Sequence, residues 1–221
     1  MMDTPLRKGQ LVAVLDFEST GLDPESAEIV SVAVVHHRLL TGVEPQLVYK
    51  TLFRCPVPIP PEATAVHGIT DEDCARRGRD AERAIAGVLP WLSGAILCSY
   101  NLPFDWLLLD KAIRRDLPGR EVPAFGHLDP WVWQRVVWPD LPSNLTAVSE
   151  QHGHRHREFA HSAEHDARAA ARVVDPLLRR VLAMGMKRKD LPTPNELWAW
   201  TRERAAGFGR GATLYRECAG R

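Results

Sequence analysis

Two acidic side chains interrupt an apolar segment near the N-terminus of this chain. Asp16 and Glu18 lie at the end of the run formed by residues 11–17, and residues two positions apart in a β-strand project from the same face. Two adjacent carboxylates repel each other and are costly to bury, so a bound cation is one of the few arrangements that keeps both in an apolar strand. The alternative is an exposed strand end on which both acids are solvated.

Composition indicates one ordinary globular domain with an appendage. The chain has 221 residues, of which 45% are hydrophobic and 25% charged, and both shares are typical of globular proteins. No segment has the apolar length of a membrane span, and the first residues lead into no signal sequence, so we expect a cytoplasmic protein without a membrane partner. Four scattered cysteines without a C-x-x-C pair indicate free thiols.

Net charge is zero, which argues against a large nonspecific nucleic-acid binder. Lysine and arginine nevertheless outnumber the acids among the charged residues between positions 155 and 189. This surplus indicates either a local basic surface or a set of solvated helix faces.

Three segments joined by short turns open the chain and predict an antiparallel meander at residues 11–17, 29–35 and 46–53. A short helix capped by Thr70 follows. Helices and strands then alternate, with strands at 95–99 and 124–128 and helices at 81–91, 103–113, 143–153 and from 162 past 174. We expect Ser143 to cap one of these helices, and Pro176 to kink or end another. The predicted fold is therefore an α/β mixed five-stranded sheet, with the meander followed by two parallel strands, flanked by helices.

The C-terminal part has its own helix signal. Residues 193–196 read Thr-Pro-Asn-Glu, a capping box with proline at the first helical position, so a last helix carries Trp198 and Trp200. The glycine-rich residues 207–211 do not follow a strand, so they indicate a flexible tail and not a dinucleotide site. We divide the chain into a main domain at residues 1–183 and a C-terminal helix and basic tail at residues 184–221. This last part either docks a protein partner or closes the core.

Further acids fall at the same edge of the predicted sheet, where ligands of open α/β sheets gather. Asp105 comes just after the fourth strand, and Asp166 lies one turn into a helix that follows His161. Taken singly, Asp105 at a helix start also suits the helix dipole, and His161 with Asp166 also suits an exposed polar helix start.

Four sequence blocks now stand in order: residues 16–24, residues 66–70, residues 101–105, and His161-x-Ala163-x-x-Asp166. In this order the chain resembles the DEDDh, or DnaQ-like, exonucleases over residues 10–178. The resemblance implies a ribonuclease H-like fold and stepwise 3′-to-5′ release of nucleoside monophosphates with two divalent metal ions. It also implies that Asp16, Glu18, Asp105 and Asp166 hold the metals, and that His161 is the general base.

The chemistry explains this set of residues. In-line hydrolysis of a phosphodiester needs an activated water and stabilisation of both the attacking and the leaving oxygens, which two metals about 3.5–4 Å apart supply together. Mg²⁺ or Mn²⁺ prefers carboxylate oxygens, and an imidazole titrates near neutral pH. His165 competes with His161 for the base role, but only His161 matches the family motif.

The resemblance further implies substrate contacts from Thr20, Gly21, Leu22, His67, Asn101 and Phe104. His67 either approaches the substrate or only caps the preceding connector. Phe104 either stacks on a base or packs in the core, and Asn101 is expected to fix its loop more than to contact a metal.

Single-stranded DNA is the expected substrate, and RNA is the main rival because recognition of the 2′ hydroxyl cannot be read from these residues. A polymerase-associated proofreading or accessory module, docked through residues 184–221, is the alternative from another class. Residues 152–156, His-Gly-His-Arg-His, indicate either a solvated loop or a zinc site that lacks cysteine ligands.

Overall fold

The computed structural model describes residues 4–124, 126–156, 161–185, 191–208 and 215. Its centre is a five-stranded sheet in the order β3-β2-β1-β4-β5. The strands are β1 Leu11–Ser19, β2 Ile29–Arg38, β3 Gln46–Leu52, β4 Ile96–Cys98 and β5 His127–Leu128. The first three are antiparallel, and β4 and β5 run parallel to β1. The predicted meander followed by two parallel strands is confirmed.

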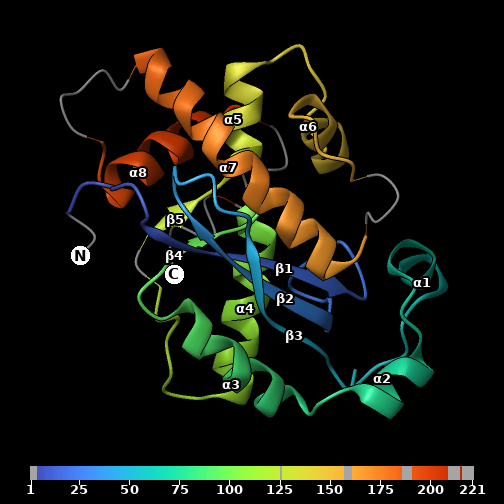
Figure 1. Ribbon diagram of the computed structural model, residues 1–221. Coiled ribbons are helices and arrows are strands. Elements are labelled where there is room, and N and C mark those ends of the chain that lie inside the picture. The colour runs from blue at the N-terminus through green and yellow to red at the C-terminus, as the bar shows by residue number, and fades with distance from the viewer. Residues whose placement is uncertain (1–3, 125, 157–160, 186–190, 209–214, 216–221) are drawn as a thin grey trace.

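Helices cover both faces of this sheet (Figure 1). In the described ranges they are α1 Pro61–His67, α2 Asp71–Arg77, α3 Ala81–Leu92, α4 Leu102–Asp116, α5 Pro130–Val137, α6 Leu145–Gln151, α7 Ala163–Gly185 and α8 Pro194–Ala205. None of these helices combines the length and apolarity needed to cross a bilayer.

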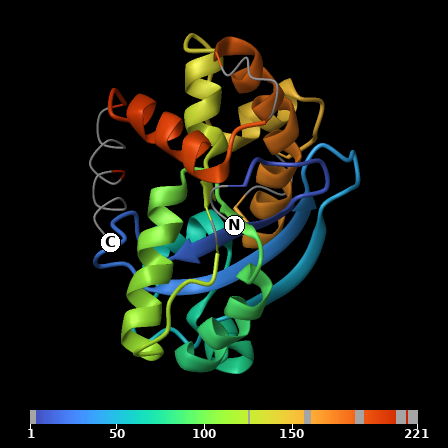
Figure 2. The ribbon, with the colours of Figure 1, turned by 90° about the vertical axis from the view of Figure 1, so that its left-hand side faces the viewer.

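Side chains of β1 alternate between two hydrophobic cores. Val12 and Val14 pack with α5, α6, α7 and α8 on one face, whereas Ala13 and Leu15 pack with α3 and α4 on the other. Figure 2 shows the helices on opposite sides of the sheet. Because Asp16 and Glu18 continue the parity of Val12 and Val14, both acids face the side of the sheet that α7 covers.

Two helix boundaries differ from the sequence expectation. Asn144, and not Ser143, caps α6, because the Asn144 side chain accepts a hydrogen bond from the Ala147 N–H at 2.9 Å. Of the two outcomes expected at Pro176, an end of the helix is wrong, because α7 continues to Gly185. A proline inside a helix costs about 3 kcal/mol, and burial of Leu177 and other apolar side chains of the second half of α7 offsets that cost. Helices α1 and α5 were not expected from the sequence.

The C-terminal helix belongs to the core. Thr193 and Glu196 form the predicted capping box, and Leu197 is fully buried in the cluster beneath α7. Tyr215 is 3% exposed and its hydroxyl donates to Asp129. For these residues the structure matches the alternative in which the segment closes the core. Residues 209–211 of the expected flexible tail lie outside the described residues.

Candidate active site

Three carboxylates from two elements meet where β1 ends. Asp16 and Glu18 of β1 and Asp166 of α7 each place one oxygen within 4.8 Å of the others. Both β1 acids sit in the regular ladder with β2, opposite Ala33 and Ser31. Small buried side chains let α7 approach the sheet closely at this point, namely Ala163, Ala167 and Ala170.

Asp105 lies beside this cluster, in the first turn of α4. Its Oδ1 accepts a hydrogen bond from the Phe17 N–H at 3.0 Å, and its Oδ2 accepts one from the Ser99 hydroxyl. The helix begins after Asn101, whose φ of 68° lies in the left-handed region that asparagine tolerates better than most residues. The structure therefore brings all four predicted acids to one edge of the sheet, with both Asp105 oxygens already engaged.

The cluster is electrostatically strained without a cation. Burial raises the pKa of Glu18 to about 8, and the negative charges of Asp166 and Asp105 add to the effect. Burial, followed by the charges of Asp105, Asp166 and Glu18, raises the pKa of Asp16 well above its usual value. Burial also raises the pKa of Asp105 to about 7, although its bonds to Ser99 and Phe17 act in the opposite direction. A divalent cation would reverse this balance, because it favours the ionised carboxylates.

One oxygen of this cluster is available to a ligand. Glu18 is only 9% exposed. Its Oε1 is buried and has no hydrogen-bond partner among the described residues. A buried carboxylate oxygen is normally paired. The donor set is made only of oxygens, which suits Mg²⁺ or Mn²⁺ better than a soft metal, so the residues fit a hard divalent cation.

His161 is held next to Asp166 by its backbone. Its N–H lies 3.3 Å from both carboxylate oxygens of Asp166, its φ is 66°, and its side chain is exposed. His165 is also exposed. The predicted base thus lies at the solvent-facing rim of the carboxylate cluster.

A second histidine, which the sequence analysis did not assign to the site, contacts Asp166 directly. His156 Nε2 lies 2.6 Å from Asp166 Oδ1, and His156 Nδ1 lies 3.1 Å from the Thr146 hydroxyl. A carboxylate only accepts, so Nε2 donates to Asp166, while Nδ1 is hydrogen-bonded to the Thr146 hydroxyl. His156 is 4% exposed. The expectation of a solvated loop at residues 152–156 is therefore wrong for His156. The only sequence signal was the histidine-rich spacing, which does not indicate this partner.

The residues expected to contact substrate fall into two groups. Leu22 is 96% exposed at the tip of the β1–β2 connection, and Thr20 Oγ1 accepts a hydrogen bond from the Glu28 N–H at its base. By contrast, Phe104 packs against the core beneath α4, and the Asn101 N–H is held by Asp129 at 3.1 Å. Gly21 is half-buried, with open space around the position of an added Cβ.

His67 has a buried ring N–H close to the site. Its Nδ1 accepts from the Ile69 N–H at 3.1 Å, so Nε2 carries the proton, and that buried atom has no partner among the described residues. Burial lowers the pKa of His67, and the nearby Ser19 backbone opposes the shift. His67 also lines a cleft of about 470 Å³ whose walls include Ser31, the β2 partner of Glu18, and Ser162 at the start of α7. The cleft therefore borders the carboxylates and has nucleotide-sized volume.

Comparison with protein families decides the membership of the chain. The sequence profile of the RNase_T exonuclease family matches residues 13–174. The chain belongs to this exonuclease family. The matched segment contains all five residues proposed for catalysis, namely Asp16, Glu18, Asp105, His161 and Asp166.

Curated relatives of this exonuclease-family chain include polymerase subunits. A DNA polymerase III subunit epsilon-like protein of Rhodobacter capsulatus is 38% identical over 109 residues, which are 48% of this chain and 15% of that protein. The DNA polymerase III subunit epsilon of Haemophilus influenzae is 30% identical over 149 residues, which are 63% of this chain and 56% of that protein. The chain therefore spans less than two thirds of the length of either relative.

Solved structures of exonucleases share this fold. E. coli exonuclease I in complex with a dT13 oligonucleotide matches with a TM-score of 0.63 at 14% identity, over 86% of this chain and 43% of that chain. Exonuclease X in complex with 5′ overhanging duplex DNA matches with a TM-score of 0.54 at 24% identity, over 76% of this chain and 91% of that chain. At these identities the likeness establishes the ribonuclease H-like exonuclease fold.

Proposed function

We propose that this chain is a metal-dependent 3′-to-5′ exonuclease that releases nucleoside monophosphates from the 3′ end of single-stranded DNA. The observation that carries the proposal is the meeting of Asp16, Glu18 and Asp166 oxygens within 4.8 Å of one another. The membership of the exonuclease family and the neighbour solved with dT13 support the reaction and the substrate.

In this proposal three acids bind the cations directly, and Asp105 has a different task. Asp16, Glu18 and Asp166 would hold two divalent cations, Mg²⁺ or Mn²⁺, which when bound activate water and stabilise the attacking and leaving oxygens. Because both Asp105 oxygens accept hydrogen bonds from the protein, Asp105 would act through a metal-bound water or after exchanging one of these bonds. Mg²⁺ commonly keeps several waters, which suits this position.

His161 would remove the proton from the attacking water, with its backbone position fixed by Asp166. The Nε2–H of His67 would donate to the terminal nucleotide in the bordering cleft, beside Thr20, Gly21 and Leu22. Phe104 and Asn101 would support the loop that presents Asp105.

The first experiment is digestion of end-labelled single-stranded DNA, duplex DNA and single-stranded RNA with Mg²⁺ or Mn²⁺, with and without chelator. We expect mononucleotides to leave from the 3′ end, fastest from single-stranded DNA, and no cleavage in chelator. Cleavage that persists in chelator would contradict the metal mechanism, and preferential digestion of RNA would make the chain an exoribonuclease.

Matched variants test the assigned residues. Asp16→Asn should lower kcat by at least about 100-fold, whereas Asp140→Asn, which changes an exposed acid, should leave it unchanged. His161→Ala should lower kcat about 100-fold, and His165→Ala should not. The reverse result for the two histidines would move the base to His165.

A polymerase-associated role is the second candidate, because two relatives are named as DNA polymerase III epsilon or epsilon-like subunits. In that case the exposed part of residues 184–221 would bind the partner. Co-purification of the chain with the polymerase catalytic subunit of its own source tests this, and a chain that elutes alone in gel filtration of the mixture would contradict it.

A further inference from the structure

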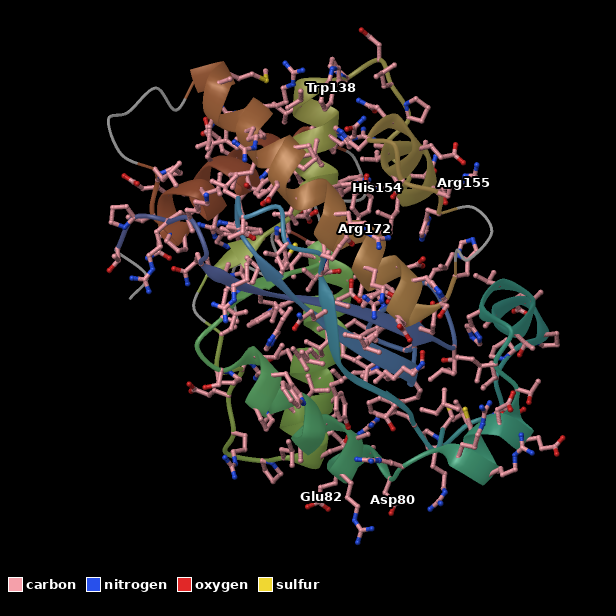
Figure 3. All side chains as sticks on the ribbon, viewed as in Figure 1. Asp80, Glu82, Trp138, His154, Arg155 and Arg172 are labelled. Carbon is pink, nitrogen blue, oxygen red and sulfur yellow. The ribbon has the colours of Figure 1, made fainter. Side chains whose placement is uncertain are left out.

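Segment 152–156 and helix α7 enclose a second, smaller pocket that the proposed reaction does not use. It has a volume of about 210 Å³ and is lined by Ala169 and by six basic residues, His154, Arg155, His156, His165, Arg168 and Arg172. We call these six residues the cationic pocket. Figure 3 shows His154, Arg155 and Arg172 gathered between α6 and α7, with the acidic Asp80 and Glu82 at the far end of the molecule.

The arginines of the cationic pocket are only partly neutralised. Arg168 bonds Glu164 at 3.2 Å, and Arg172 bonds Glu44 at 3.1 and 3.0 Å. Arg155 is exposed and forms no ion pair with another residue in the described ranges. The Glu44 side chain is 74% exposed, and such surface pairs contribute little, so an anion can compete for Arg172. The pocket therefore keeps an excess of positive charge in a chain whose net charge is zero.

The chemistry of the pocket suits phosphate and not zinc. Arginine cannot ligate a cation, but its planar guanidinium matches the oxygens of a phosphate. Both ring nitrogens of His156 are already bonded, to Thr146 and Asp166. Within the described residues, the one group of three or more potential metal ligands that converge is Asp16, Glu18 and Asp166. The histidine-rich segment thus lines a pocket whose side chains suit an anion.

The pocket adjoins the carboxylate cluster. His156 lines the pocket and also bonds Asp166, while His165 lines it from the position next to Asp166 in sequence. A single imidazole ring therefore separates the pocket from a proposed metal ligand. An anion bound there would be a close neighbour of the phosphate that is cleaved.

We propose that the cationic pocket binds a backbone phosphate of the substrate strand on the 5′ side of the scissile bond. This inference rests on the proposed function. In a 3′-to-5′ exonuclease the scissile phosphodiester is the last one of the strand, so any second phosphate in reach must lie upstream. The pocket then holds the strand that remains after each cleavage and does not contact the leaving nucleotide.

This placement predicts a dependence on substrate length. A dinucleotide with a single phosphodiester has no upstream phosphate, whereas a twenty-nucleotide oligothymidylate has many. The double variant Arg155→Ala/Arg172→Ala should raise the KM for the long substrate about 5-fold or more and leave kcat/KM for the dinucleotide within about 2-fold. The slope of log binding constant against log salt should fall by about 0.7 for each phosphate of the single strand that the variant no longer neutralises.

Two further variants sharpen the test. Glu44→Gln removes the acid that pairs with Arg172 and should lower the KM for the long substrate. Arg120→Ala changes an exposed arginine just beyond the C-terminal end of α4, on the face of the sheet opposite α7. This control should leave the KM for the long substrate and the kcat/KM for the dinucleotide unchanged. Melting temperatures confirm that each variant is folded.

The outcomes separate the two proposals. Equal losses on the dinucleotide and the long substrate, or no loss on either, would overturn the cationic pocket as an upstream phosphate site. Tighter binding of a free mononucleotide than of the long strand would also overturn it, because the pocket would then be a product site. If the wild-type chain cleaves nothing, the proposed function fails, and fluorescence anisotropy of the labelled oligothymidylate with Ca²⁺ still measures whether the double variant weakens binding.

Discussion

His156 joins the helix-borne acid Asp166 to the neighbouring helix α6. Its ring is hydrogen-bonded to Thr146 of α6 and donates a hydrogen bond to Asp166 of α7. Carboxylates that ligate metals are commonly held by such outer partners, whose loss weakens metal binding 10–100-fold in typical cases. We therefore assign His156 as a positioning residue for Asp166.

His156→Leu is predicted to raise the Mn²⁺ concentration for half-maximal activation about 10-fold, with a smaller effect on kcat at saturating Mn²⁺. His156→Gln keeps an N–H donor and should recover most of the affinity. Titration calorimetry with Mn²⁺ measures the same shift without substrate. Loss of kcat at saturating metal with unchanged Mn²⁺ affinity would instead assign His156 a direct role in the reaction.

At the scale of elements, one buried acid fixes the start of two helices. Asp129 caps α5 through the Trp131 N–H at 2.9 Å and also accepts from the N–H groups of Asn101 and Leu102 where α4 begins. The Tyr215 hydroxyl donates to the same carboxylate. Because α4 carries Asp105 in its first turn, Asp129 sets the position of a proposed catalytic acid from outside the site.

Asp129→Ala is predicted to lower the free energy of unfolding by about 3–5 kcal/mol, because each buried N–H left without a partner costs about 1–3 kcal/mol. Tyr215→Phe removes one hydroxyl donor and should cost about 1 kcal/mol. Urea unfolding measures both. A cost for Asp129→Ala no larger than that of Tyr215→Phe would contradict the role of Asp129 as a shared acceptor.

Helix α8 has a comparable structural task, since Leu197 is fully buried and Thr201 accepts a hydrogen bond from the indole of Trp133 at 3.0 Å. The family match ends at residue 174, before α8 begins. A chain shortened to end at Met184 is nevertheless predicted to expose Trp133 and to have a melting temperature lower by more than about 10 °C. Leu197→Ala, a milder change, should cost about 2–5 kcal/mol. An unchanged melting temperature of the shortened chain would show that α8 is dispensable for the fold.

At the scale of the whole molecule, the carboxylate cluster links stability to pH. The pKa of Glu18 rises from 4.5 to about 8 on folding, so the folded state keeps a proton that the unfolded state releases. The Glu18 contribution to stability is therefore full below about pH 4.5 and is lost as pH rises through about 8. A divalent cation bound to the ionised acids should restore it.

In chelator, Glu18→Gln is predicted to raise the melting temperature relative to the wild type. The difference should grow from pH 4.5 to pH 8 and reach at least about 3 °C, which corresponds to roughly 1 kcal/mol for a chain of this size. Adding Mn²⁺ at pH 8 should stabilise the wild type and have little effect on Glu18→Gln. Thermal melts followed by circular dichroism test this. A difference that shrinks as pH rises would show that Glu18 is not held protonated by burial.

The sequence was informative where a signal is local. The i, i+2 spacing of Asp16 and Glu18 in a strand, and the position of Asp105 just past β4, were enough to predict that these acids lie at one edge of the sheet. The antiparallel meander and the two strands that follow it were predicted from the strand and helix periodicities. Each of these predictions rests on a pattern within one short segment of the chain.

The contacts that support the site depend on packing that no local sequence pattern indicates. Asp129 and Tyr215 are 86 positions apart, and no periodicity predicts their bond. His156 lies in an irregular segment, so its partner follows from packing of α6 on α7 and not from sequence spacing. Burial of Leu177 and its neighbours likewise overrode the local tendency of Pro176 to end a helix.

The left-handed backbone of His161, at φ 66°, has an evolutionary consequence. Glycine and asparagine adopt this conformation more readily than histidine does, so selection for stability alone would favour replacing His161. In descendants of this chain released from selection for catalysis, we expect glycine or asparagine at this position, accompanied by loss of acids at positions 16 and 18. Position 161 would thus serve as a marker that separates working copies from decayed ones in a genome.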